Sequence, residues 1–235
     1  MHRRAQTTLL AALATLLLAA PARAATYVPP RGQVFAGITD TRIAADFQDY
    51  ATLVGKPHVP VVQAFHPWGT DPSEALARWQ GYRVRGVLSI STAPGYGAPG
   101  TISPREIAQG GGDDYLLTLN REIAAAGSIT YLRPLGEMNN GHNAYSATTA
   151  TGASRGVDFS HYWYKQAWRR MFIVVRGGGA SSLVNSQLAG LGMPPLKKVG
   201  GHQVPATLAA PRVAFIWCPL PDGSPHIGAQ AAIKY

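Results

Sequence analysis

Short, almost continuous apolar segments alternate with helix-like segments along most of this chain, and this alternation limits the folds that it can adopt. Strands that are apolar on both faces are typical of a parallel sheet whose helical crossovers cover it. The chain is therefore expected to be an α/β protein. The predicted strands are residues 33–38, 58–65, 85–91, 129–135 and 212–217.

Helix-start signals lie between the predicted strands. Asp71 and Ser103 are each followed by proline and then, three residues after the cap, by glutamate, which is the pattern of a capped helix start. Asp40 or Thr41 is expected to cap the first helix. Further helices are predicted over residues 113–126 and 161–176, the second capped by Ser160, whereas residues 180–211 are expected to form an irregular connection.

Two architectures combine parallel strands with helical crossovers: a doubly wound sheet and a (β/α)8 barrel. Residues 38–42, the first strand-to-helix turn, lack the glycine-rich phosphate signature of nucleotide-binding doubly wound folds. The candidate polar residues follow the strands, as they do on the active face of a barrel. We therefore expect a (β/α)8 TIM-barrel type of fold. A complete barrel has eight strands and about 250 residues, so about five predicted strands indicate an incomplete barrel.

The first residues have the features of a secretory signal peptide. Arg3 and Arg4 precede an apolar run over residues 9–20, and Ala22-Arg-Ala24 is a small-x-small cleavage site. The apolar run is shorter than the ~20 residues that span a bilayer. We expect residues 1–24 to be removed, residues 25–235 to be secreted as the N-terminal part of the barrel, and no membrane association afterwards. The alternative is a retained anchor.

The charge pattern argues against nucleic acid as a partner. The formal net charge is +9, of which Arg3, Arg4 and Arg23 contribute three, leaving +6 for residues 25–235. The basic residues are scattered rather than clustered, which favours a basic exported surface. Cys218 is the sole cysteine and is interpreted as a small core residue. No histidines or cysteines have metal-ligand spacing, so neither a metal nor a cofactor is expected.

The stretch from Ile129 to Tyr145 contains the main candidate for chemistry. Tyr131 and Arg133 alternate toward one face of the predicted strand, and Glu137 continues that series beyond its end. A buried arginine needs an anionic partner. Arg133 would hold a carboxylate ionised as a nucleophile, while a glutamate in a less polar place keeps its proton as a general acid. The alternative is an ordinary Arg133–Glu137 pair that ties the strand to the loop.

Aromatic, amide and imidazole groups gather after three of the predicted strands. Aromatic rings stack on the C–H faces of sugars, and amides and imidazoles hydrogen-bond sugar hydroxyls. A polysaccharide or oligosaccharide is therefore the expected partner, although each residue taken alone fits core packing or loop capping equally well. The candidate sugar-binding residues are His66, Trp68, Asn139, His142, Tyr145 and Trp217.

The run Arg133-Pro-Leu-Gly-Glu-Met-Asn139 resembles the strand-four motif of glycoside hydrolase family 26, the β-mannanase family. Other segments are similar to the same family: Ile102-Ser-Pro, Gly112-Asp113 with Tyr115, Ala167-Trp-Arg-Arg170 and Val213-Ala-Phe-Ile-Trp217. The resemblance implies a retaining, endo-acting glycosidase on a (β/α)8 barrel. It also implies that Glu137 is the acid/base, that Arg133 supports the nucleophile, and that Trp217, His66 and Trp68 line a sugar subsite.

The chain departs from the family pattern in two places. Gly136 stands where mannan-cleaving members usually have histidine, and no glutamate follows Glu137 to match the nucleophile on strand seven. Retention requires two carboxyl groups about 5–5.5 Å apart. Two alternatives therefore stay open: a catalytically inactive carbohydrate-binding protein that uses the same cleft, and an unrelated exported α/β protein in which Glu137 and Arg133 are structural.

Overall fold

The structure, a computed structural model, describes residues 27–55, 60–197 and 203–221. The predicted signal peptide and the start of the second predicted strand lie outside these residues. The chain divides into two compact units, residues 1–36 and 37–235. In the described part of the first unit, the Gln33 N–H donates to the Pro30 carbonyl in a turn (3.0 Å).

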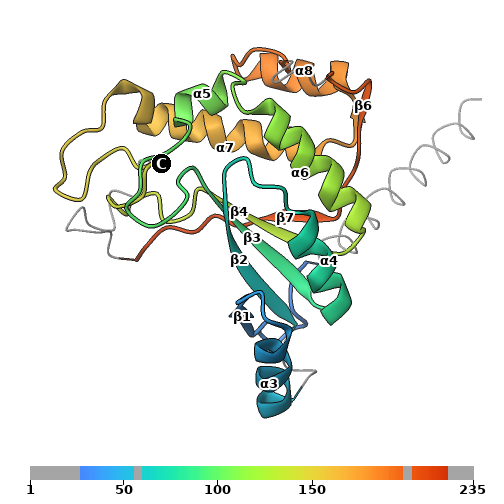
Figure 1. The fold of residues 1–235 in the computed structure, drawn as a ribbon. Coiled ribbons are helices and arrows are strands. Elements are labelled where there is room, and N and C mark those ends of the chain that lie inside the picture. The colour runs from blue at the N-terminus through green and yellow to red at the C-terminus, as the bar shows by residue number, and fades with distance from the viewer. Residues whose placement is uncertain (1–26, 56–59, 198–202, 222–235) are drawn as a thin grey trace, which may run out of the picture. The chain divides into compact units, whose positions relative to one another are not determined.

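Five strands of the described chain form one parallel sheet (Figure 1). The α/β prediction is confirmed. The predicted strand at residues 85–91 has the same bounds in the structure, whereas the first strand is much shorter than residues 33–38. In sheet order, the strands are β1 (Gly37–Thr39), β2 (Val61–Pro67), β3 (Arg85–Ser91), β4 (Thr130–Pro134) and β7 (Val213–Phe215).

Helices connect the successive strands. The predicted helices are present, but residues 180–211 were wrongly expected to be irregular, because they include a ten-residue helix and one strand of an antiparallel pair. That pair is β5 (Gly179–Ala180) with β6 (Thr207–Leu208). The helices are α3 (Ala44–Val54), α4 (Ser73–Tyr82), α5 (Pro104–Ala108), α6 (Asp113–Ala126), the 3-10 helix η2 (Val157–Phe159), α7 (His161–Arg176) and α8 (Ser181–Gly190).

Local caps explain where several helices begin. The Ser103 hydroxyl accepts from the Glu106 N–H (3.2 Å), and the Glu106 carboxylate accepts from the Ser103 N–H (2.7 Å), so the predicted capping box of α5 is confirmed. The Ser160 hydroxyl likewise accepts from the Trp163 N–H at the start of α7. The predicted cap of the first helix is wrong, because α3 has Ile43 at its N-cap and no side-chain cap.

One face of the sheet packs against the helices. Side chains alternate along a strand, and Val62, Leu88, Ile90 and Leu132 are buried in the same core cluster as residues of α4, α6 and α7. Gly86 belongs to this face, and a Cβ there would lie 1.9 Å from the Trp79 ring of α4. The missing side chain therefore lets Trp79 pack directly on the sheet.

A buried ion pair joins two of the covering helices. The carboxylate of Asp113, at the start of α6, accepts from Nε and Nη2 of Arg170 in α7 at 2.7 and 2.6 Å. Arg170 also donates to the carbonyls of Ala108, Pro194 and Pro195, and both side chains of the pair are fully buried. Since every charged atom has partners, the pair fixes the relative positions of α6 and α7.

The opposite face of the sheet presents a different row of side chains. Phe65, Ser89 and Arg133 are register partners on β2, β3 and β4. They lie near the carboxyl ends of these strands, where loops from β3 and β4 converge. Among the residues that the structure describes, no helix is both long and apolar enough to cross a lipid bilayer.

Candidate functional site

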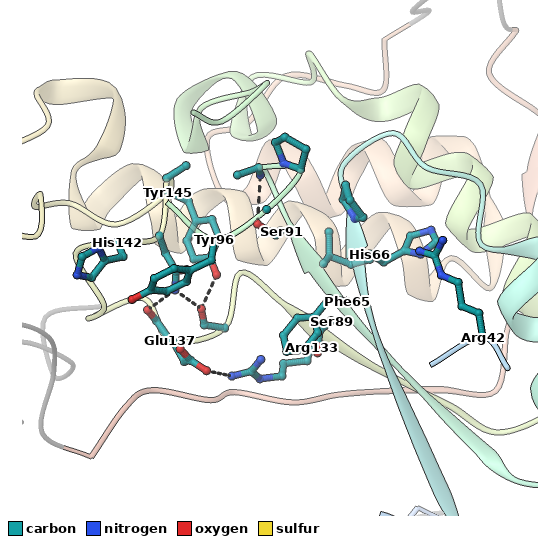
Figure 2. Close-up of a pocket in the computed structure, with 18 residues that line it drawn as sticks. Arg42, Phe65, His66, Ser89, Ser91, Tyr96, Arg133, Glu137, His142 and Tyr145 are labelled. Carbon is teal, nitrogen blue, oxygen red and sulfur yellow. Dashed lines mark hydrogen bonds and ion pairs between the residues drawn. The ribbon is translucent and has the colours of Figure 1, made fainter. Parts of the chain in front are cut away.

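A pocket of about 440 Å³ lies at the carboxyl ends of β2, β3 and β4 (Figure 2). Its floor is the row of side chains opposite the helices, and its walls are the loops that follow β1, β3 and β4. Ligands of open and closed parallel sheets bind at this edge. The main polar and aromatic lining residues are Arg42, Phe65, His66, Ser89, Ser91, Tyr96, Arg133, Glu137, His142, Asn143 and Tyr145.

Glu137 and Arg133 form an ion pair inside the pocket. Arg133 Nη2 donates to Glu137 Oε1 at 2.8 Å, and the Asn140 amide donates to Glu137 Oε2 at 3.3 Å. The carboxylate thus lies among polar donors, unlike the less polar place expected from the sequence. The side chains keep 13% and 31% exposure, so the pair remains open to the pocket.

The Arg133 guanidinium stays charged in this setting. Burial alone would lower the pKa of Arg133, but its hydrogen bond to Glu137 and its interactions with Cys218 raise that pKa above the ordinary value. Arg133 is therefore a permanent cation on the floor of the pocket, able to bind an anionic group as well as Glu137.

The loop that carries Glu137 has an uncommon backbone. Leu135 (φ 49°) and Glu137 (φ 56°) are left-handed, a conformation that non-glycine residues rarely adopt. The Glu137 N–H donates to the Cys218 carbonyl, and the Gly136 carbonyl accepts from the Tyr145 hydroxyl. Strained positions held by surrounding contacts are frequent at functional sites. The loop is therefore fixed by Cys218, in the segment after β7, on one side and by Tyr145 on the other.

The glycine before Glu137 makes space for Arg133. A Cβ on Gly136 would lie 2.7 Å from Cζ and Nε of Arg133. The guanidinium therefore occupies the volume that any side chain at position 136 would need. The Arg133–Glu137 pair in its present geometry therefore depends on the absence of a side chain at position 136.

Aromatic and polar side chains complete the pocket wall. Tyr96, in the glycine-rich loop after β3, stacks on His142 with ring centroids 5.2 Å apart and an interplanar angle of 28°. Phe65 is 60% exposed. The Ser89 hydroxyl is buried and has no hydrogen-bond partner among the described residues. The pocket thus offers ring faces next to the Arg133–Glu137 pair, with an enclosed Ser89 hydroxyl beneath its floor.

His66 lines the pocket at the end of β2, but one ring nitrogen is already engaged. Its Nε2 lies 2.8 Å from the Thr70 carbonyl, which makes Nε2 the protonated nitrogen if the ring is neutral. Burial lowers the pKa of His66, and the nearby positive charge of Arg42 lowers it further, although the Thr70 contact acts in the opposite direction. His66 is therefore a neutral ring near pH 7, fixed in orientation by Thr70.

Three residues predicted to bind sugar do not line this pocket. Asn139 is buried and pairs in both directions with the Leu220 backbone, at 2.8 Å each way. Trp68 packs on Tyr115 with centroids 4.8 Å apart. Trp217, although 43% exposed, packs edge-to-face on Tyr164 and Trp168 of α7. Their contacts here are structural, whereas His66, His142 and Tyr145 lie with Arg133 and Glu137.

Several lining residues were not anticipated from the sequence. Arg42 follows β1 in the same way that His66 follows β2, so its position after a strand was an available signal. Phe65 and Ser89 needed the strand register, and Tyr96 needed the path of a flexible-looking glycine-rich loop. In the described part of the chain, no three His, Cys, Asp or Glu side chains are grouped to hold a metal ion.

Comparison with known proteins adds no assignment to this geometry. Searches of the chain against protein-family models and against curated proteins find no match.

Proposed function

We propose that the protein is a secreted glycosidase related to glycoside hydrolase family 26, acting on a β-linked polysaccharide with Glu137 as acid/base. The observation that carries this proposal is the position of Glu137. Among the described residues that line the pocket, Glu137 is the one with a carboxylate. It lies at the carboxyl edge of a parallel sheet, beside aromatic rings and amides suited to binding sugars.

The order of the strands supports a barrel-type fold for this enzyme. The strands lie in the sheet in the same order as in the chain, and the sheet contains no reversal. A doubly wound sheet reverses its order at the switch point where its ligand binds. Because successive connections proceed in one direction, helices collect on one face and the other face becomes the inside of a barrel.

Glu137 would act twice in a retaining reaction. It would first give its proton to the oxygen of the glycosidic bond while a second carboxylate, which the described lining does not contain, takes the glycosyl group. It would later remove a proton from the water that displaces this carboxylate from the sugar. For the first step Glu137 must be protonated, so Arg133 must turn from it toward another acceptor. Asn140 and Asn143 would hold the loop, since they hydrogen-bond the carboxylate and the backbone of Glu137.

A direct test compares hydrolysis by two matched variants. The protein and its Glu137→Gln variant are incubated with soluble β-mannan, and new reducing ends are measured. Loss of the acid/base should lower turnover by about 10²–10⁴-fold. Glu74→Gln makes the same chemical change at an exposed site on α4 and should leave turnover unaltered. Equal turnover by the protein and Glu137→Gln would remove Glu137 from the mechanism.

A binding function without hydrolysis is the second candidate. The observation that favours it is that Glu137 has no second carboxylate beside it among the described residues of the pocket, although retention uses two. This candidate predicts saccharide binding that survives Glu137→Gln, with no release of reducing ends by either protein. Absence of both binding and hydrolysis would leave Arg133 and Glu137 as a structural pair.

Export is part of the same proposal. The proposal rests on the charged start, the apolar run and the small-x-small site within residues 1–24, which are the features of a cleaved signal peptide. Expression with the natural N-terminus should yield extracellular protein that begins at Ala25, as read by intact mass. Retention of residues 1–24 on a membrane-bound product would instead indicate an anchor.

A further inference from the structure

We propose that the pocket selects an anionic saccharide, a chain that carries uronic-acid carboxylates, and that Arg42 binds one of these carboxylates. This inference rests on the proposed saccharide function and adds a substrate class to it. It concerns the end of the pocket away from Glu137, where the loop after β1 meets the end of β2 (Figure 2).

The charges of the pocket favour an anion. Two arginines, Arg42 and Arg133, line it with one carboxylate, Glu137, and that carboxylate is paired with Arg133. None of the carboxylates in the described chain forms an ion pair with Arg42. A guanidinium at the wall of a concave site binds carboxylate through two parallel hydrogen bonds. Arg42 is thus a cation without a carboxylate partner among the described residues, and an anionic ligand in the pocket can pair with it.

The acid nearest to Arg42 in the sequence is already used. Asp40 Oδ2 accepts from Nη2 of Arg78 (2.7 Å) and from Nε1 of Trp79 (2.8 Å). Asp40 Oδ1 accepts from the backbone N–H of Arg42 at 2.8 Å. The Asp40 carboxylate therefore fixes the backbone of Arg42 and neutralises the guanidinium of Arg78. The guanidinium of Arg42 takes no part in this ion pair and is available to a ligand in the pocket.

The backbone at Arg42 is specifically fixed rather than free. Arg42 is left-handed (φ 68°), and the preceding turn is joined to β2 because the Asp40 N–H donates to the Gln63 carbonyl at 2.7 Å. A non-glycine residue in this conformation carries an energetic cost. The turn bears that cost while it presents Arg42 toward His66 (Figure 2). Arg42 also lies near enough to His66 for its positive charge to lower the pKa of that ring.

An unsatisfied hydroxyl marks the middle of the same pocket. Ser89 is 4% exposed, its Oγ has no partner among the described residues, and it lies in register between Phe65 and Arg133. A buried hydroxyl without a partner is destabilising. The Ser89 Oγ is itself enclosed, so a polar ligand in the pocket would reach it only after the hydroxyl turned toward the pocket.

The pocket is long enough to separate the anion from the bond that is cleaved. Arg42 follows β1 and Glu137 follows β4, so about three strand spacings, roughly 14 Å in total, lie between their strands. This span exceeds one sugar ring. The carboxylate at Arg42 therefore belongs to a sugar some way along the chain from Glu137, with Phe65 and Tyr96 offering ring faces between them.

The test uses two tetrasaccharides that differ only at C6: β-1,4-mannotetraose and β-1,4-tetramannuronate. Calorimetric titration of the protein should give tighter binding of the mannuronate. Arg42→Gln should weaken mannuronate binding about tenfold or more and change mannotetraose binding less than about twofold, because the neutral sugar has no carboxylate for Arg42. Arg42→Lys keeps the charge and should retain part of the preference.

Arg83→Gln is the matched control. Arg83 is also an exposed, left-handed arginine (φ 60°), but it ends α4 and does not line the pocket. It should leave both affinities unchanged. A sulfated mannotetraose distinguishes carboxylate from anionic sugars in general, since weaker binding than the mannuronate is expected for the non-planar sulfate. Equal or tighter binding of the sulfated sugar would overturn the assignment to uronate.

The two levels of the proposal fail in different ways. If mannotetraose binds as tightly as the mannuronate and Arg42→Gln alters neither, the anionic substrate class is wrong while the saccharide function stands. If neither tetrasaccharide binds, both proposals are wrong. A preference for mannuronate that Arg42→Gln does not reduce would overturn the role of Arg42.

Discussion

Among the arginine–carboxylate pairs of the described chain, two have the same chemistry in opposite surroundings. Arg170–Asp113 lies between helices on the covered side of the sheet with both side chains at 0% exposure. Arg133–Glu137 lies on the other side, at the strand ends, and keeps contact with the pocket. Further carbonyls saturate Arg170, whereas the loop around Glu137 is strained and borders an unpartnered hydroxyl.

The comparison shows how one interaction serves two purposes. A fully enclosed pair with every hydrogen bond made has one arrangement, and breaking it leaves a buried charge. A pair at a pocket wall can exchange partners with a ligand, because water and the ligand both reach it. We therefore expect the enclosed pair to matter for stability and propose that the open pair serves ligand binding; the following variants separate these roles.

Breaking the enclosed pair should have the largest effect on folding. Asp113→Ala leaves the Arg170 charge buried without its carboxylate and should lower the free energy of unfolding by about 3–5 kcal/mol. Urea denaturation followed by circular dichroism measures it. The double replacement Asp113→Leu with Arg170→Met removes both charges and should recover much of the loss. A loss below about 1 kcal/mol for Asp113→Ala would contradict the enclosed role.

Acid should remove the stabilisation that a third carboxylate, Asp40, gives to the folded protein. The burial of Asp40 lies between that of Asp113 and that of Glu137. Burial would raise the pKa of Asp40, but hydrogen bonds from Arg78, from the Arg42 N–H and from Trp79 hold that pKa below its ordinary value of 3.8. The folded pKa is depressed, so the stabilisation is present above pH 3.8 and is lost as pH falls through the folded value.

Asp40→Asn is the variant that measures this contribution. At pH 7 it should cost about 2 kcal/mol, the usual size for hydrogen bonds to a charged group. The difference between Asp40→Asn and the unchanged protein should shrink as the pH falls below 3.8. A difference that is constant from pH 7 to pH 2.5, taken as roughly the acid limit of such titrations, would show that the Asp40 charge is not stabilising.

A side chain at position 136 should disturb the open pair. Gly136→Ala places a methyl group against the Arg133 guanidinium and should cost about 1 kcal/mol, with Arg133 displaced from Glu137. Gly81→Ala, in α4 where nothing lies within 4 Å, should instead stabilise by about 0.5–1 kcal/mol. Thermal denaturation of both variants gives the contrast. Equal stabilisation by the two alanines would mean that Arg133 does not occupy the space beside Gly136.

Removing the charge of the open pair should affect folding least. Arg133→Gln should change the free energy of unfolding by about 1 kcal/mol or less, because the pair is partly solvated. The same variant should weaken saccharide binding clearly, since Arg133 forms the pocket floor. A large loss of stability with unchanged binding would place Arg133 with Arg170 as a structural residue.

The sequence was most informative where local chemistry decides the structure. The capping box at Ser103, the cap at Ser160 and the strand Arg85–Ser91 depend on neighbouring residues and could be predicted. Helix α8 was missed because it buries only Val184 and Leu188 and so shows little apolar periodicity. The proximity of Glu137 to His142 and Tyr145 also followed from one short loop.

Hydrogen-bond partners that lie far apart along the chain could not be predicted from the sequence. Asp40 or Thr41 was expected to cap α3, but the Asp40 carboxylate binds Arg78 and Trp79, which lie 38 and 39 residues away. Asn139 was expected to bind sugar, but its amide is taken by the Leu220 backbone, 81 residues away. A polar residue after a strand is available to a ligand only if no distant partner claims it, and that condition depends on the tertiary structure.

The most direct test of the central claim is to locate the saccharide on the protein. In an NMR titration with mannotetraose and tetramannuronate, the signals of Tyr96, His142 and the Arg133 side chain should shift together with saturation, because these groups line one pocket. The Trp217 indole, which packs on α7, should shift little. Saturable shifts confined to Trp217 and α7, with none at Tyr96, His142 or Arg133, would contradict the account.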